Sequence, residues 1–208
     1  ITSTDPGFPR DAAAWCNSTG NQLISKETAG GKSVVVIEKG EPKSCNIVTS
    51  CEGKGKTFIM FSDDLDKALA TFVLANGAAA TGQKVTIFFT FWGLNVIKKL
   101  HKPNVEKDIF GKMFGMMLPS SSRKLKLSKM SMGGIGGKMM RYIMNRKGID
   151  SLESLRQQAL ENGVEFIACQ MSMDVMGVKQ EELLDEVTIG GVATYMERAD
   201  NANINLFI

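Results

Sequence analysis

Two apolar segments that flank a helical pattern constrain the fold of this chain more than any other feature. Residues 57–61 predict a short apolar strand, and residues 84–89 predict a second strand that is apolar on both sides. Between them, residues 65–81 repeat apolar side chains at helical spacing until Gly82, a typical helix stop. Apolar strands joined by a helix predict a β-α-β unit in a parallel sheet. We therefore expect an α/β protein.

The same alternation continues toward the C-terminus. Residues 164–168 predict a third buried strand, which ends at Cys169. Three further helices and a final strand are expected at residues 151–161, 179–186, 192–199 and 203–208. These elements place a domain at residues 57–208.

Residues 1–40 predict a small α/β unit of their own. Pro9 suits the first turn of a helix that continues to residue 17. Two strands, at 21–26 and 33–38, flank a hairpin connection at 28–31. Since the chain starts with isoleucine and has no secretory leader, we expect that it begins inside a longer polypeptide or after processing.

Residues 41–56 predict a linker, because they are rich in glycine, proline and serine and have little periodicity. Of the four cysteines, Cys45 and Cys51 lie in this linker. We interpret them as exposed thiols, with a local redox pair as the alternative. The other two, Cys16 and Cys169, also lack a Cys-x-x-Cys partner, and the single histidine is His101. No metal site is therefore expected, and cysteine usage suggests a reducing, cytoplasmic location.

Residues 98–147 form a basic, methionine-rich insertion. It holds 13 lysines and arginines against two acids, Glu106 and Asp108, and eight of the 13 methionines of the chain. Such a segment can face an acidic partner or a membrane surface. The alternative that we favour is a solvated loop and helix whose methionines fill irregular gaps. The longest apolar run, at 85–97, is too short to cross a bilayer, so no membrane partner is expected.

Two glycine-rich segments resemble phosphate-binding loops without completing the pattern. Residues 31–33 have the end of such a loop, but Lys26 stands where the first glycine is required. Residues 133–138 are followed by Met139, where a magnesium-binding hydroxyl is required. We therefore expect no nucleotide and no other cofactor.

We expect a candidate site at the carboxyl ends of the predicted strands, because ligands of open parallel sheets bind at this edge. Ser62, Asp63 and Asp64 follow the first strand, where they also suit a helix-capping turn. Phe91 and Trp92 follow the second strand and could form an apolar wall for a small ligand, although such residues more often belong to a core. The candidate substrate-binding residues are Ser62, Asp63, Phe91, Trp92, Gly93 and Ser172.

Cys169, at the end of the third strand, is the candidate catalytic residue. Ser172 could cap a short helix from Met173, whose positive end would favour a thiolate nearby. A thiolate can take the outer sulfur of a donor persulfide and later lose it to another thiolate. The alternative is an inert, buried strand residue, and position alone leaves both interpretations open.

Four separated blocks make residues 56–208 resemble the DsrE/DsrF-like sulfur-carrier family, in its subgroup with a long insertion. The blocks are FSDDLDKA at 61–68, FFTFWGLN at 88–95, ACQMSMDVMG at 168–177 and GGVATY at 190–195. The resemblance implies a flavodoxin-like three-layer sandwich with a mainly parallel sheet, assembled into homotrimers or hexamers. It also implies that Cys169 accepts the sulfur.

Residues 1–40 resemble the C-terminal half of a TusA-like domain, through DPGFPRD at 5–11 and the pair Trp15-Cys16. The Cys-Pro-x-Pro motif of that family is absent, so no sulfur-carrying role is assigned to Cys16. TusA-like and DsrE-like domains in this order are similar to the C-terminal end of pyridine-nucleotide-disulfide reductases that also carry a rhodanese domain. The resemblance implies a rhodanese-like or TusA-like sulfur donor and a thiol acceptor.

The sequence therefore predicts a sulfurtransferase-like carrier that relays sulfane sulfur as a persulfide on Cys169. The alternative is a non-catalytic oligomerisation and interaction module of a larger disulfide-reductase fusion, in which Cys169 is a packing residue. No nucleic-acid partner is expected in either case.

Overall fold

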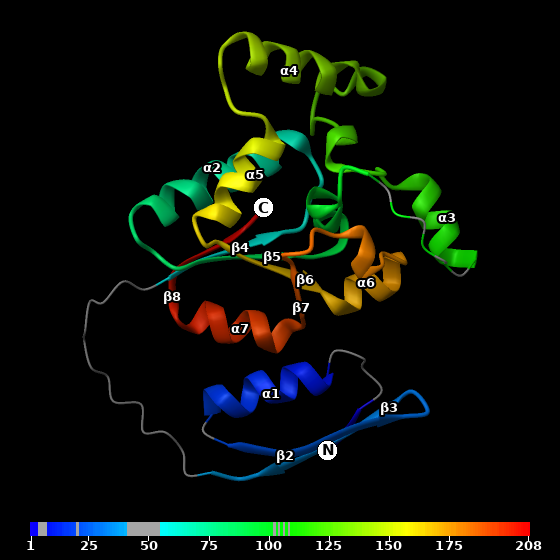
Figure 1. Ribbon diagram of the computed structural model, residues 1–208, viewed down its shortest axis with the longest axis vertical. Coiled ribbons are helices and arrows are strands. Elements are labelled where there is room, and N and C mark those ends of the chain that lie inside the picture. Colours follow the sequence, from blue (N-terminus) through cyan, green and yellow to red (C-terminus); the bar gives the residue numbers. More distant parts are fainter. Residues whose placement is uncertain are drawn as a thin grey trace.

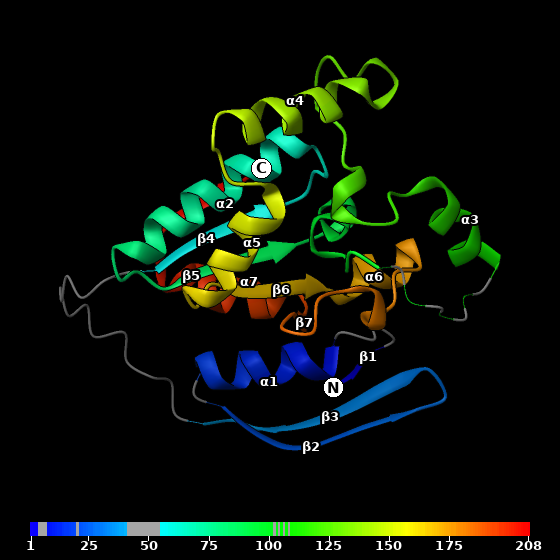
Figure 2. The same ribbon diagram turned by 45° about the horizontal axis from the view of Figure 1, so that its top comes forward.

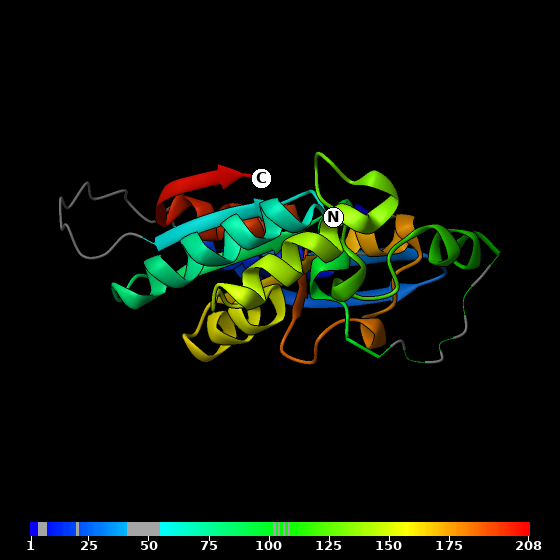
Figure 3. The ribbon, with the colours of Figure 1, turned by 90° about the horizontal axis from the view of Figure 1, so that it is seen from above.

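The computed structural model describes residues 1–3, 8–19, 21–40, 55–101, 103, 105, 107 and 109–208, which build two separate sheets (Figure 1). The larger sheet has five parallel strands in the order β7-β6-β5-β4-β8. They are β4 (Gly55–Met60), β5 (Val85–Phe89), β6 (Glu165–Cys169), β7 (Thr188–Gly190) and β8 (Ala202–Phe207). In Figure 3, β8 (red) lies at the outer edge beside β4 (cyan). The predicted parallel sheet is confirmed.

Helices cover both faces of the large sheet. α2 (Leu65–Ala80) and α5 (Leu152–Glu161) pack side by side on one face, and α7 (Val192–Asp200) lies on the other (Figure 1). Ser151 caps α5 as predicted, since its side chain accepts a hydrogen bond from the backbone N–H of Ser154. The predicted fold class, a flavodoxin-like three-layer α/β sandwich with a mainly parallel sheet, is confirmed.

Side chains of the central strands alternate between two apolar clusters. Phe89 and Phe166 belong to the larger cluster, beneath α2 and α5, where their ring centroids are 5.3 Å apart. Phe88 and Cys169 belong to a smaller cluster beneath α7. Successive residues of a strand point to opposite faces, so both faces of these strands are buried. This explains why β5 and β6 are almost entirely apolar.

The N-terminal unit is a three-stranded antiparallel sheet with one helix. Its elements are β1 (Thr2–Ser3), α1 (Phe8–Thr19), β2 (Gln22–Ala29) and β3 (Lys32–Glu38), with the strands in the order β1-β3-β2. Gly30 and Gly31 form the hairpin turn with φ angles of 58° and 73°, which glycine adopts without strain. Figures 1 and 2 show α1 between this sheet and α7.

The insertion folds as short helices that are fixed to the sandwich. After η1 (Phe91–Ile97) come α3 (Ile109–Met117), η2 (Ser122–Lys124), η3 (Met132–Gly134) and α4 (Ile135–Arg146). The backbone N–H of Leu65 donates to the Lys126 carbonyl over 2.7 Å, and Asp66 accepts from the backbone N–H of Ser128 at 2.9 Å. The first turn of α2 therefore holds the middle of the insertion.

Near the C-terminus, the sequence analysis mispredicts one helix and misses one strand. The helix expected at 179–186 is a single turn, η4 (Gln180–Glu182), because the chain then extends and Leu183 pairs with Lys98. Strand β7, only three residues long, was not predicted.

The predicted linker differs from the structure at its end. Gly55 and Lys56, expected in the linker, begin β4, whereas residues 41–54, with Cys45 and Cys51, lie outside the described residues. Within the described part of the chain, no helix is long and apolar enough to cross a bilayer.

Candidate functional site

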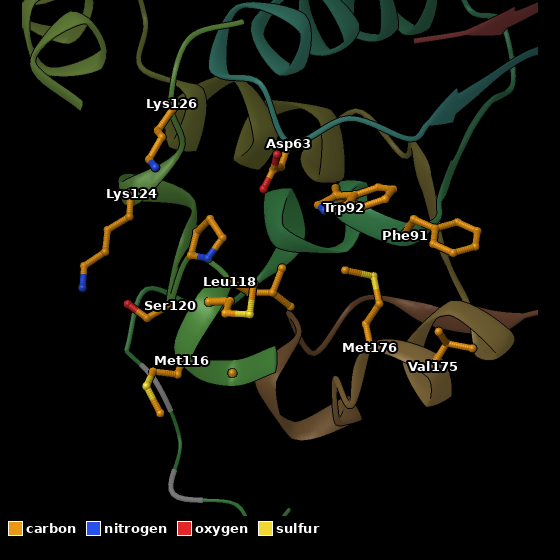
Figure 4. Close-up of a pocket in the computed structure, with 13 residues that line it drawn as sticks. Asp63, Phe91, Trp92, Met116, Leu118, Ser120, Lys124, Lys126, Val175 and Met176 are labelled. Carbon is orange, nitrogen blue, oxygen red and sulfur yellow. The ribbon is translucent and has the colours of Figure 1, made fainter. Parts of the chain in front are cut away.

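The carboxyl edge of the large sheet and the insertion border an open cavity of about 810 Å³ (Figure 4). Three parts of the chain line it: the segments after β4 and β5, the insertion, and the end of α6 (Gln170–Met176). The lining residues used below are Asp63, Phe91, Trp92, Met116, Met117, Leu118, Lys124, Lys126 and Met176. This is the edge at which the sequence places the site.

Asp63 projects into the cavity from the segment after β4 (Figure 4). Burial of the carboxyl group raises its pKa, and the negative charge of Asp64 acts in the same direction. A hydrogen bond of 2.9 Å from Asn95 Nδ2 and the nearby ammonium of Lys98 oppose this rise in pKa. Asp63 is thus a carboxyl group whose charge is disfavoured by its surroundings.

The neighbours of Asp63 have structural roles. Asp64 stands at the N-cap position of α2, and its carboxylate accepts from Ser62 Oγ at 2.7 Å and pairs with Lys67 at 2.8 Å. Asp64 therefore occupies the predicted capping position, but its carboxylate accepts no hydrogen bond from a backbone N–H of the helix and instead joins a cluster with Ser62 and Lys67. This cluster holds Ser62 beside the lining of the cavity.

Phe91 and Trp92 form the aromatic wall of the cavity, and their ring centroids are 5.8 Å apart. Phe91 has a φ of 47°, a left-handed conformation that is uncommon and strained for a non-glycine residue. Gly93 makes this turn possible: its N–H donates to the Phe61 carbonyl over 2.9 Å, and a Cβ atom there would overlap the Met60 carbonyl oxygen. Gly93 therefore shapes the site through its backbone.

Cys169 lies on the other side of the sheet from this cavity. Its side chain is 2% exposed and packs with Phe88, Ile167 and Tyr195. It is the last residue of β6 and the N-cap of α6, which begins directly at Gln170. The expected helix start at Met173 is therefore wrong.

Ser172 lies inside α6 instead of capping it. It is fully buried, and its Oγ lies 2.8 Å from Thr90 Oγ1 at the end of β5. The structure thus brings Asp63, Phe91 and Trp92 into one cavity and gives Ser62, Gly93 and Ser172 supporting positions around it. Cys169 belongs to a separate environment.

The sequence pattern did not identify the insertion as a wall of the site. Lys124, Lys126, Met116 and Met117 were counted in a basic, methionine-rich segment that we expected to be a solvated loop and helix. The excess of lysine and arginine in the insertion was the one available indication of a binding role, but a charge pattern does not show against which part of the fold an insertion packs. Among the described residues, no group of three or more His, Cys, Asp or Glu side chains could hold a metal ion.

Comparisons with known proteins identify relatives that cover about three-quarters of the chain. The model of the DsrE/DsrF/DrsH-like family matches residues 53–207. YrkE of Bacillus subtilis is 44% identical over 155 residues, 74% of this chain and 97% of that protein. Sulfur carrier protein DsrE2 of Allochromatium vinosum is 38% identical over 161 residues, 76% of this chain and 99% of that protein. The crystal structure of the ychN protein of E. coli superposes with a TM-score of 0.45 at 11% identity, covering 74% of this chain and 99% of that chain.

Proposed function

Because this chain belongs to the DsrE/DsrF/DrsH-like family, we propose that it is a sulfur carrier that relays sulfane sulfur as a persulfide on Cys169. One observation carries the proposal: Cys169 is the only cysteine within residues 53–207. A persulfide held by the family domain must therefore form on this residue. The similarity to the sulfur carrier DsrE2 over 161 residues supports the same role.

The proposed transfer needs no cofactor and no net oxidation. The Cys169 thiolate attacks the outer sulfur of a donor persulfide, so that a new S–S bond forms on Cys169. The S–S bond of the donor breaks, and the donor leaves as a thiolate. An acceptor thiolate then removes the outer sulfur by the same exchange and restores the Cys169 thiolate. The proposed donor is a rhodanese-like or TusA-like protein.

The burial of Cys169 sets a condition on this chemistry. A thiol that is 2% exposed cannot meet a donor persulfide directly, so the side chain must become exposed before transfer. Tyr195 of α7 belongs to the cluster that encloses the thiol. We propose that local opening on the α7 face admits the donor. The substrate-binding roles of Ser62, Asp63, Phe91, Trp92, Gly93 and Ser172, and assembly into a homotrimer or hexamer, remain predictions.

Persulfide loading tests the proposal directly. The protein is incubated with thiosulfate and a rhodanese, and mass gains are mapped peptide by peptide. We expect a gain of one sulfur atom on the peptide that contains Cys169, and loss of this gain in Cys169→Ser with Cys16, Cys45 and Cys51 intact. Unchanged loading of the variant would contradict the proposal.

The same burial favours a second candidate function, a non-catalytic interaction module in which Cys169 is a packing residue. The two functions differ in the reactivity of the thiol. A carrier should be labelled by a maleimide at Cys169 under native conditions, although slowly. A module should be labelled at Cys169 only under conditions that unfold the whole domain.

A further inference from the structure

We propose that the cavity between the insertion and the carboxyl edge of the sheet binds a small organic anion with an apolar body. Its occupant would lie against the aromatic and methionine side chains and place its charged group near Lys124 and Lys126. Cys169 is not among the residues that line this cavity, and its side chain belongs to the cluster beneath α7.

The wall formed by the insertion is fixed at several points. Lys98, only 4% exposed, donates from Nζ to the Pro119 carbonyl over 3.1 Å. Lys107 and Glu182 form a buried ion pair of 2.5 Å. Gly177, at the end of α6, approaches Gly111 of α3 so closely that a Cβ atom would overlap it. Together with the contacts of α2 to Lys126 and Ser128, these anchors make the cavity a built feature of the fold.

The apolar side of the cavity is large and exposed. Trp92 is 45% exposed, Met116 86% and Met117 76%, and Leu118 and Met176 also line the cavity. Figure 4 shows Trp92 and Met116 on different sides of it. Methionine side chains adapt to irregular ligands, and an aromatic ring offers a flat surface for stacking. A volume of about 810 Å³ lies in the usual range for sites of organic ligands and is far larger than an inorganic ion requires.

The charges around the cavity favour an anion. Lys124 and Lys126 line it, and Lys98 lies beneath the Pro119 carbonyl. Among the described lining residues, Asp63 is the one acid, and its carboxylate is already held by a hydrogen bond of 2.9 Å from Asn95 Nδ2. A carboxylate, sulfonate or phosphate on the ligand can therefore pair with the two lysines. A neutral apolar molecule would form no ion pair with the two lysines.

Fluorescence of Trp92 can report binding, because the chain has only two tryptophans and Trp15→Phe leaves Trp92 as the single one. The probes are decanoate and decan-1-ol, which share an apolar chain and differ in charge. We expect saturable quenching by decanoate, with an affinity about tenfold higher than for decan-1-ol. Calorimetry of the unmodified chain with the same probes provides a readout that does not depend on Trp15→Phe.

Charge variants test where the anion lies. Lys124→Ala with Lys126→Ala should weaken decanoate binding about tenfold and leave decan-1-ol binding unchanged. The matched control is Lys129→Ala with Lys138→Ala, two exposed lysines of the insertion that lie outside the lining, and it should bind decanoate as the wild type does. Cys169→Ser should also bind normally, which separates this site from the proposed relay. Equal affinity for both probes, or an equal loss in both lysine pairs, would overturn the proposal.

Discussion

At the scale of single residues, the carboxyl edge of the sheet depends on close backbone approaches that side chains could not tolerate. Gly93 lies against the Met60 carbonyl, and Phe91, two residues earlier, accepts a strained φ of 47°. The strain persists because the surrounding aromatic cluster, with Phe61 at 5.3 Å from Phe91, holds the turn in place. The position of the aromatic wall is therefore determined by backbone geometry as much as by apolar packing.

Gly93→Ala should lower the free energy of unfolding by about 2–3 kcal/mol, because the added methyl group overlaps a backbone carbonyl that cannot move without disturbing β4. Urea unfolding measures the loss. The control is Gly77→Ala inside α2, where a Cβ atom meets open space and helix propensity predicts a gain of about 0.5–1 kcal/mol. Similar effects of both substitutions would contradict the role of Gly93.

Asp63 should make the protein less stable as pH rises. Since its pKa is raised above 3.8 in the folded state, the folded protein binds more protons here than the unfolded chain, and stability falls as pH increases through this range. Asp63→Asn removes this titration while keeping an oxygen for Asn95. Urea unfolding across the pH scale should show the variant more stable than wild type at neutral pH, with the difference disappearing at acidic pH. A difference that grows at acidic pH would show the opposite shift.

At the scale of elements, the sequence predicts the helices and strands that have a regular apolar pattern. It does not predict elements that form only through contacts with other parts of the chain. The strands at 57–61, 84–89 and 164–168 were found because burial on both faces leaves a continuous apolar pattern. Strand β7 is too short for any pattern, and it exists because Ala168 and Cys169 of β6 pair with it. Because both faces of these strands are buried and apolar, the sequence pattern does not show on which face of the sheet a given side chain lies. Cys169 could therefore be placed at a strand end but not assigned to the α7 side.

The start of α7 depends on such a contact, because the carboxylate of Asp11 in the N-terminal unit lies against Gly191. Gly191 occupies the N-cap position, and Thr194 Oγ1 donates to Asp11 of α1 over 3.3 Å. A carboxylate near a helix N-terminus stabilises it. Asp11→Ala should lower the free energy of unfolding by about 1 kcal/mol. Hydrogen exchange should show faster opening of α7, and Asp11→Asn, which keeps the acceptor, should lose less. Unchanged exchange in α7 would contradict this role.

At the scale of the whole molecule, the two proposed sites lie in different parts of the large domain. The cavity with Asp63 and Trp92 opens beside the insertion, whereas Cys169 lies beneath α7, to which α1 is docked. Two elements connect these regions: α6 begins at Cys169 and ends at the cavity with Met176, and β5 runs from Phe88, in the cluster around the thiol, to the segment that carries Phe91 and Trp92.

Access to Cys169 through the α7 face can be tested by removing a side chain of α7 that packs in the cluster around the thiol. Tyr195 lies in van der Waals reach of the cluster around the thiol, with its ring centroid 5.3 Å from that of Phe88, and its hydroxyl is 3.3 Å from Thr57 Oγ1. Tyr195→Ala removes the ring and opens space above the sulfur. In a background with the other three cysteines replaced by serine, we expect maleimide labelling of Cys169 to become about tenfold faster, because each 1.4 kcal/mol taken from the opening free energy raises the open population tenfold.

Tyr195→Phe is the matched control, since it keeps the ring in the cluster that contains the thiol and removes only the hydroxyl group. Its labelling rate should stay near that of the parent protein, and persulfide loading by thiosulfate and rhodanese should follow the same order as labelling. If Tyr195→Ala raises the labelling rate but not the loading rate, the donor reaches Cys169 from another side. If it raises neither while the protein stays folded, α7 is not the cover that limits the thiol, and the carboxyl end of β6 becomes the route to examine.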